Sequence, residues 1–260
     1  MAKFDSPFDF SGKMGNFSVY KMKGSDKLIV RKKGGPTKKQ VKLSPRFERT
    51  RENNAEFAAC TRLTAGIRRA LFPLRHLGDI RFTGGLNKLA KQIQRLDDKG
   101  ERGQRSVYLS RHGDMLAGFN FNQQAAFDSV LRHPVTVKAD RKNVAAAVTI
   151  PRLMPGISLS LPWNAPFYRF VVVLAAVGDV VLTKGRFLPV ECAGVEMSYT
   201  AWSHAKATTD ATDIRLQLEE GVKKGVSLVL AIGVEAGMPD RYGEMETIAG
   251  PGAAKILTVF

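Results

Sequence analysis

The chain has 260 residues and combines 40 Lys plus Arg with 24 Asp plus Glu, which gives a formal net charge of +16 at pH 7. An apolar share of 44% beside 25% charged residues is ordinary for a globular protein, so a wholly disordered chain is excluded. Two cysteines exclude a disulfide-rich scaffold, and we expect a reducing, cytoplasmic environment.

The positive charge is concentrated in the N-terminal part of the sequence. Residues 1–112 hold 26 Lys plus Arg against 10 Asp plus Glu, whereas residues 113–260 hold 14 of each kind. An excess of this size favours polyanionic partners, although a solvated face that only aids solubility is the alternative. The predicted polyanion-binding residues are Lys21, Lys23, Lys27, Arg31, Lys32, Lys33, Lys38, Lys39, Lys42, Arg46 and Arg49.

The first elements expected along the chain form a β-hairpin. Residues 17–21 and 27–31 are rich in strand-forming side chains, and residues 23–26 between them are typical of a turn. Because side chains alternate along a strand, one face of the second strand carries four residues: Lys27, Ile29, Arg31 and Lys33. After the glycines and proline at 34–36, we expect residues 37–43 to form a basic loop.

Three helices are predicted next. Ser44-Pro45 is typical of a helix start, and apolar residues at spacings of three and four continue to Leu71, before Pro73 ends the pattern. The same periodicity predicts a second helix over residues 86–97 and a third over residues 122–131. Cys60 falls on the apolar face of the first helix, where we expect an inert structural thiol.

From Pro134 onward the sequence predicts strands separated by turns. Many short strands at this spacing favour an antiparallel β-sandwich or barrel. Four prolines between Pro151 and Pro166 predict a stiff loop or edge segment there, because proline cannot donate a backbone hydrogen bond to a sheet. The strand-like segments are residues 135–138, 144–150, 157–161, 167–177, 180–182, 195–201, 214–218, 226–234 and 256–260.

We expect no export signal and no membrane span. The first ten residues contain acids and a proline where a secretory signal would need an apolar run. The longest apolar run, residues 170–177, is much shorter than the roughly 20 residues that a membrane-spanning helix requires.

Motifs for catalysis or metal binding are weak. The segment 250–255 is rich in glycine but lacks the spacing of a phosphate-binding loop, so we interpret it as a turn. Ser203 and Lys206 match the Ser-x-x-Lys pattern of serine acyl enzymes without the partner motifs of those enzymes. The histidines and cysteines do not lie at metal-ligand spacings, and we predict no catalytic residue, no metal and no cofactor. A pocket that joined His112 or His204 to a carboxylate would favour an enzyme instead.

Aromatic residues within and beside the basic segment indicate how a nucleic acid would be bound. Phe17, Tyr20 and Phe47 would stack on bases while neighbouring cations contact phosphates, although packing in a core is the alternative for these rings. The sequence contains no zinc-finger, RNA-recognition or helix-turn-helix signature. Binding is therefore expected to be electrostatic and tolerant of sequence.

The N-terminal sequence resembles the opening of an uncharacterised family of bacterial proteins. Four segments carry the resemblance, which extends to about residue 70: GNFSVYKMKGSDK (15–27), RKKGGP (31–36), Phe47 and RENNAEF (51–57). Because that family has no established activity, the resemblance implies no catalytic residue. It implies a bacterial origin and a non-catalytic role.

Together these features predict an α+β protein. A basic hairpin and helical module (residues 1–132) is expected to precede a neutral, antiparallel β-sandwich-like module (133–260), and docking of the first helix on the strands would join them in one core. We expect a non-enzymatic structural or assembly protein whose basic surface binds nucleic acid, or another polyanion, without strong sequence specificity. Two alternatives stay open. One is a homo-oligomeric assembly subunit whose basic hairpin meets an acidic face of a neighbour, and the other is an unrecognised hydrolase or transferase.

Overall fold

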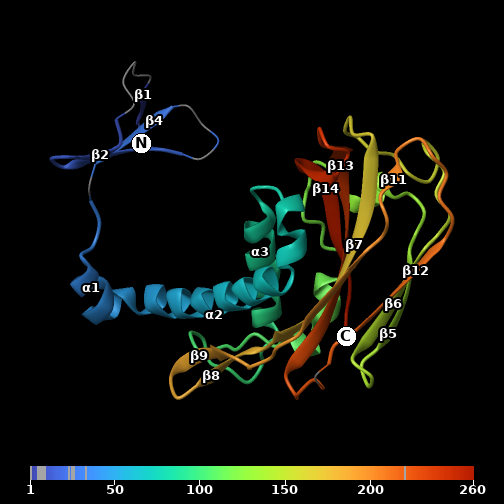
Figure 1. Cartoon of the computed structure of the whole chain (residues 1–260). Helices are drawn as coiled ribbons and strands as arrows, with labels where there is room; N and C mark the ends of the chain where they lie inside the picture. The colour runs from blue at the N-terminus through green and yellow to red at the C-terminus, as the bar shows by residue number, and fades with distance from the viewer. Residues whose placement is uncertain (1, 5–9, 23, 25–26, 33, 220) are drawn as a thin grey trace. The chain divides into compact units, whose positions relative to one another are not determined.

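The structure of the protein is a computed structural model that describes residues 2–4, 10–22, 24, 27–32, 34–219 and 221–260 (Figure 1). The chain forms two units, residues 1–51 and residues 52–260, which are described separately. The first unit contains a small sheet and the second a large antiparallel sheet with helices, so the predicted α+β class is confirmed.

Four short antiparallel strands form the sheet of the first unit, in the order β1-β4-β3-β2. The expected hairpin is the central pair of this sheet, in which Val19 lies opposite Val30. Val19, Leu28 and Ile29 are buried and supply the apolar contacts of this sheet. The strands are β1 (Ala2–Phe4), β2 (Gly12–Met14), β3 (Phe17–Lys21) and β4 (Leu28–Lys32).

A helix, α1 (Lys38–Leu43), occupies the segment for which a basic loop was predicted, so that prediction is wrong. The Thr37 hydroxyl accepts a hydrogen bond from the Gln40 backbone N–H, and the Gln40 side chain accepts one from the Thr37 backbone N–H. This capping box satisfies two backbone donors at the helix start. At the other end, Arg51 Nη1 donates to the carbonyl oxygens of Val41 and Ser44 at 3.0 and 2.8 Å.

The first long helix begins close to the predicted position. Pro45 opens a 3-10 turn, η1 (Pro45–Phe47), and α2 continues from Glu48 to Ala70. Its predicted apolar face is confirmed at Cys60, Leu63 and Ile67, which are buried, whereas Phe57, at the start of the predicted pattern, is exposed. After α2 come η2 (Phe72–Leu77), α3 (Phe82–Arg95), η3 (Leu109–Arg111) and η4 (Gly113–Leu116).

The third predicted helix, over residues 122–131, is reduced to a single turn, α4 (Phe127–Val130). The Asn122 side chain accepts hydrogen bonds from the backbone N–H groups of Gln124 and Ala125, and the Asn120 side chain accepts one from Phe127. Such side-chain bonds compete with helical backbone bonds, which explains why the helix does not extend toward Asn122.

An antiparallel sheet in the order β10-β7-β13-β14 forms the centre of the second unit, and β11 pairs with β7 alongside β10. A three-stranded sheet, β12-β6-β5, and a ribbon, β8-β9, complete the unit. The central strands are β7 (Phe167–Gly178), β10 (Val195–Tyr199), β11 (Ser203–His204), β13 (Val226–Pro239) and β14 (Met245–Val259). The others are β5 (Thr136–Asp140), β6 (Ala145–Ile150), β8 (Val180–Thr183), β9 (Arg186–Pro189) and β12 (Thr212–Gln217).

Both faces of the central sheet are covered within the second unit. Alternate residues of β7, such as Val171 and Val173, pack in a core with α2 and α3, while Val172 and Leu174 pack in another core with β6 and β12. Figure 1 shows the central sheet between these helices and the three-stranded sheet. Burial on both faces accounts for the continuous apolar run of β7.

Two further segments differ from their predicted structure. Residues 250–255, interpreted as a turn, lie within strand β14. Residues 157–161, predicted as a strand, form an irregular turn because the Met154 carbonyl accepts hydrogen bonds from the N–H groups of Ile157, Ser158 and Leu159. Modules on either side of residue 132 were expected, with docking of the first helix joining them in one core. The chain divides into units at residue 51, and residues of α2, η2 and α3 share a core with residues of β7, β13 and β14.

Candidate nucleic-acid interface

One face of the N-terminal sheet carries cations beside an aromatic ring. The strand register places Lys13 of β2 opposite Ser18 of β3, and Ser18 opposite Arg31 of β4. Tyr20 shares this face because it lies two residues after Ser18 on the same strand. Lys13, Tyr20 and Arg31 are exposed to solvent. We refer to Lys13, Ser18, Tyr20 and Arg31 together as the basic face.

A cleft of about 370 Å³ lies on the same pair of strands. Its lining residues are Ser18, Tyr20, Arg31, Lys32 and Gly34. The cleft therefore combines two hydroxyl groups, a guanidinium group, an ammonium group and an aromatic ring. One guanidinium group can donate two parallel hydrogen bonds to two oxygens of a phosphate, and an aromatic ring can stack on any of the bases. This combination suits a nucleotide unit of a single strand.

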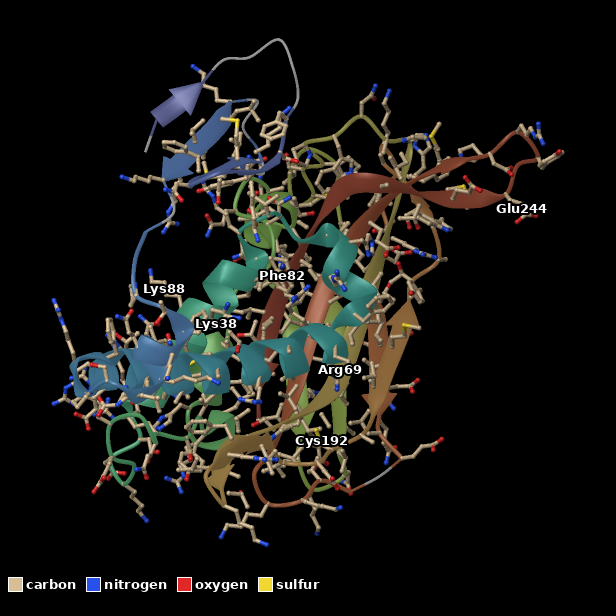
Figure 2. The ribbon with its side chains drawn as sticks, turned by 90° about the vertical axis from the view of Figure 1, so that its left-hand side faces the viewer. Lys38, Arg69, Phe82, Lys88, Cys192 and Glu244 are labelled. Carbon is tan, nitrogen blue, oxygen red and sulfur yellow. The ribbon has the colours of Figure 1, made fainter. Side chains whose placement is uncertain are left out.

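A second group of cations follows on α1. Lys38, Lys39 and Lys42 are all exposed, and no residue of this helix is buried; Figure 2 marks Lys38 on it. Lys38 and Lys42 are four residues apart and therefore lie on the same side of the helix, where like charges destabilise it. The capping box and the Arg51 hydrogen bonds counteract this repulsion. A helix stabilised against its own charge is suited to an external anion.

The structure places nine of the eleven predicted polyanion-binding residues, and all nine are exposed. Lys23 and Lys33 lie outside the described residues. Throughout the described part of the chain, six of the nine have no carboxylate within 4.0 Å: Arg31, Lys32, Lys38, Lys39, Lys42 and Arg46. Residues 1–51 contain 14 Lys plus Arg against 4 Asp plus Glu, a net charge of +10, so these charges are not balanced by their own unit.

The residues predicted from the sequence make up part of this surface, and other residues complete it. Tyr20 lines the cleft, whereas Phe17 lies on the opposite face of the sheet and Phe47 is half-buried in η1. Lys13 was not among the predicted residues, because it precedes the densest basic segment. The pairing of β2 with β3 brings it opposite Ser18 and onto the same face of the sheet as Arg31, one strand further on.

The enzymatic alternatives gain little from the geometry at the residues singled out in the sequence. Ser203 starts the short strand β11 and Lys206 follows it in a turn, so they do not share the helical turn that the Ser-x-x-Lys arrangement requires. His204 Nδ1 accepts a hydrogen bond from the Lys206 backbone N–H. Within the described residues, neither His112 nor His204 forms an ion pair with a carboxylate, and no group of three or more His, Cys, Asp or Glu is placed to hold a metal ion.

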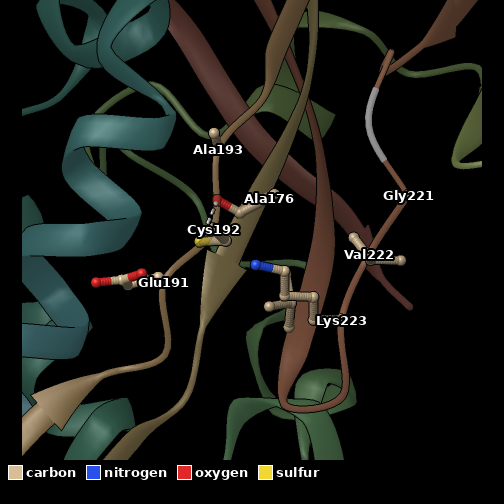
Figure 3. A pocket seen from close by; sticks show the side chains of 8 residues that line it. Ala176, Glu191, Cys192, Ala193, Gly221, Val222 and Lys223 are labelled. Atoms are coloured by element: carbon tan, nitrogen blue, oxygen red, sulfur yellow. Dashed lines mark hydrogen bonds between the residues drawn. The ribbon is translucent and has the colours of Figure 1, made fainter.

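A hollow of about 210 Å³ surrounds Cys192 in the second unit (Figure 3), and Glu191 and Lys223 also line it. The Cys192 Sγ atom donates to the Ala176 carbonyl oxygen at 3.6 Å, and burial raises the pKa of this thiol. A nucleophilic thiol needs a lowered pKa and a neighbouring base. A raised pKa does not favour the thiolate form that such a nucleophile requires.

Comparison of the chain with protein-family models, curated proteins and solved structures finds no match, which is consistent with the resemblance to a family without established activity. No activity or ligand is therefore transferred from a relative. In the described part of the chain, every helix is too short or too polar to cross a membrane.

Proposed function

We propose that the protein is a non-enzymatic structural or assembly protein whose basic N-terminal surface binds nucleic acid without strong sequence specificity. One observation carries the proposal: six exposed cations of the first unit have no carboxylate partner among the described residues. They are Arg31, Lys32, Lys38, Lys39, Lys42 and Arg46.

The chemistry of these groups favours phosphates as their partners. Each cation that meets a phosphate releases condensed counterions, and this release supplies most of the free energy of non-specific binding. Six such contacts give a slope of log affinity against log salt of about −5 on duplex DNA and about −4 on a single strand. A large negative slope is therefore the signature of this surface.

Tolerance of sequence follows from the types of side chain present. Lysine and arginine contact the backbone of any nucleic acid, and the Tyr20 ring in the cleft stacks on any base. Among the described residues that line the cleft there is no asparagine or glutamine, the residue types that read adenine edges. The surface thus favours positioning on a strand over recognition of a particular base sequence.

The experiment that tests this function combines binding with sizing. Fluorescence anisotropy of the full chain with labelled duplex DNA and labelled single-stranded RNA is measured from low to high salt, and light scattering measures the particle size with and without nucleic acid. We expect binding to at least one probe at low salt, with the slope given above.

The results separate the proposal from its alternatives. Binding to neither probe at low salt would sink the nucleic-acid proposal. A large homogeneous particle that forms without any nucleic acid would favour a protein-only assembly subunit. In that case the exposed edges of the short outer strands β1 and β2 would pair with strands of neighbouring copies.

A further inference from the structure

A pocket that belongs entirely to the second unit lies where η2 packs on the central sheet. Its volume is about 460 Å³, within the usual range for sites that bind small ligands. Three elements supply the lining that matters here: Phe72, Arg75 and His76 from η2, Met197 and Tyr199 from β10, and Glu235 from β13. The pocket therefore has an apolar part and a charged part.

Two glycines of the sheet allow η2 to approach closely enough to form one wall of this pocket. A Cβ atom at Gly233 would lie 2.6 Å from the Leu77 side chain, and one at Gly252 would overlap the same side chain. Leu74 and Leu77 are thereby buried against the sheet, while Phe72 and the neighbouring polar residues of η2 stay exposed. The glycines thus set the position of the pocket wall.

A buried carboxylate orients the histidine of the pocket. Glu235 is only 3% exposed, and its Oε1 atom lies 3.0 Å from His76 Nε2. Burial alone would raise the pKa of Glu235, but hydrogen bonds from His76 and Arg169 lower it below the usual value. Glu235 is therefore an ionised acceptor. Because His76 Nε2 donates to it, Nδ1 is the ring nitrogen left for another partner.

The charge of Glu235 is already balanced by Arg169. The Arg169 Nε atom lies 2.7 Å from Glu235 Oε2. The guanidinium carbon of Arg169 is 4.2 Å from the centroid of the Tyr199 ring and 4.5 Å from that of Trp202. Two rings and a carboxylate therefore hold this arginine in place, and they add rigidity to one side of the pocket.

Arg75 is the uncompensated charge of the pocket. It is exposed, and the described part of the chain places no carboxylate within 4.0 Å of it. Beside it lie apolar side chains that are unusually open to solvent, since Phe72 is 66% and Met197 46% exposed. Exposed apolar groups gathered around a cation mark a binding surface.

We propose that this pocket binds a small aromatic anion, either an aryl carboxylate or an aryl phosphate. The anionic group pairs with the Arg75 guanidinium, whose planar fork matches both kinds of oxyanion. The aromatic ring packs on Phe72, Met197 and Tyr199. Glu235 does not repel the anion as a bare charge would, because Arg169 neutralises it.

Titration of the full chain with three probes of similar shape tests the proposal. Benzoate and phenyl phosphate distinguish the two kinds of anion, and benzamide is the neutral control. Isothermal titration measures the affinity, and amide chemical shifts of residues 72, 74–76 and 197–199 locate the site. We expect one-to-one saturable binding of at least one anion, about tenfold or more tighter than that of benzamide.

Variants at exposed positions link the binding to the pocket. Arg75→Gln and Phe72→Ala are each expected to weaken binding about tenfold or more, because one removes the charge and the other the stacking surface. Arg95→Gln and Tyr242→Ala, which alter an exposed arginine and an exposed tyrosine outside the pocket, are expected to bind as the unaltered chain does. Circular dichroism checks that every variant is folded.

Three results overturn the proposal: saturable binding of neither anion, equal affinity for benzamide, or unchanged affinity in Arg75→Gln. If Arg75→Gln does not fold, Arg75→Lys decides the question, because it keeps the charge and removes the planar fork. Affinity between that of benzamide and that of the unaltered chain supports the proposed role of Arg75, whereas unchanged affinity contradicts it.

Discussion

The triple variant Lys38→Gln, Lys39→Gln, Lys42→Gln replaces the three lysines of α1 by glutamine. It tests whether the unpaired cations of the first unit bind nucleic acid. These side chains are exposed and contribute no buried surface, so the change removes charge and leaves packing intact. Glutamine also has a helix propensity close to that of lysine. The fold of the first unit should therefore survive, while half of the six unpaired cations are lost.

The size of the effect follows from counterion release. Six phosphate contacts on duplex DNA give a slope of about −5.4, and three contacts give about −2.7. Raising the salt concentration fourfold, from about 50 to 200 mM, should then weaken the unaltered chain by about 1,800-fold and the triple variant by only about 40-fold. At low salt the triple variant should already bind much more weakly than the unaltered chain.

Fluorescence anisotropy over this salt range gives both slopes. The matched control replaces three exposed lysines of the second unit, Lys184→Gln with Lys206→Gln and Lys224→Gln, and changes the net charge by the same amount. The control should keep the slope of the unaltered chain. An equal fall in slope for both triple variants would refute the reasoning, because it would show that total charge matters and the N-terminal surface does not.

Three further results are expected. Gly252→Ala should lower the free energy of unfolding by about 1–3 kcal/mol in urea titrations, because its Cβ would overlap Leu77. Gly84→Ala in α3 has open space around it and should raise this free energy by up to about 1 kcal/mol. Equal effects of the two variants would contradict the close approach of η2 to the sheet. A thiol reagent should label Cys192 in the folded chain and Cys60 only after unfolding, because Cys60 is 0% exposed and burial raises the pKa of its thiol to about 11; labelling of both at one rate would contradict this burial. Finally, because the pKa of Glu235 is lowered in the folded chain, this carboxylate stabilises the fold above its ordinary pKa near 4.5, and the stabilisation is lost as the pH falls below that value. Glu235→Gln should therefore reduce the loss of unfolding free energy between pH 5 and 3. An unchanged loss in the variant would contradict the role of the Glu235 ion pairs.

Local patterns in the sequence predicted those parts of the fold that local forces determine. The apolar face of α2 and the β3–β4 hairpin follow from side-chain spacing and turn residues close in sequence. The capping box at Thr37 and Gln40 is also a local signal, and it favours α1 in spite of the high charge of that segment. The helix predicted over residues 122–131 does not form in full, because the side chains of Asn120 and Asn122 accept hydrogen bonds from backbone N–H groups of this segment.

The candidate sites divide in the same way. Charge alone located the basic segment, because exposed lysines and arginines need no partner from elsewhere in the chain. The pocket at Arg75 could not be predicted, since His76 and Glu235 are far apart in sequence and meet only when β13 joins the sheet beneath η2. Periodicity reports which face of a strand is buried and carries no information about which distant side chain lies opposite.

The central position of β7 bears on how the chain folds during its synthesis. One edge of β7 pairs with β10 and β11, and the other pairs with β13, whose residues leave the ribosome later than all of these. Until β13, which begins at residue 226, has been synthesised, the apolar residues 170–177 have no strand to pair with along one edge of β7. A nascent chain of that length presents an open, strongly apolar strand edge, the kind of surface that aggregates or recruits chaperones. Pausing of synthesis before β13 should therefore harm this protein more than pausing after it.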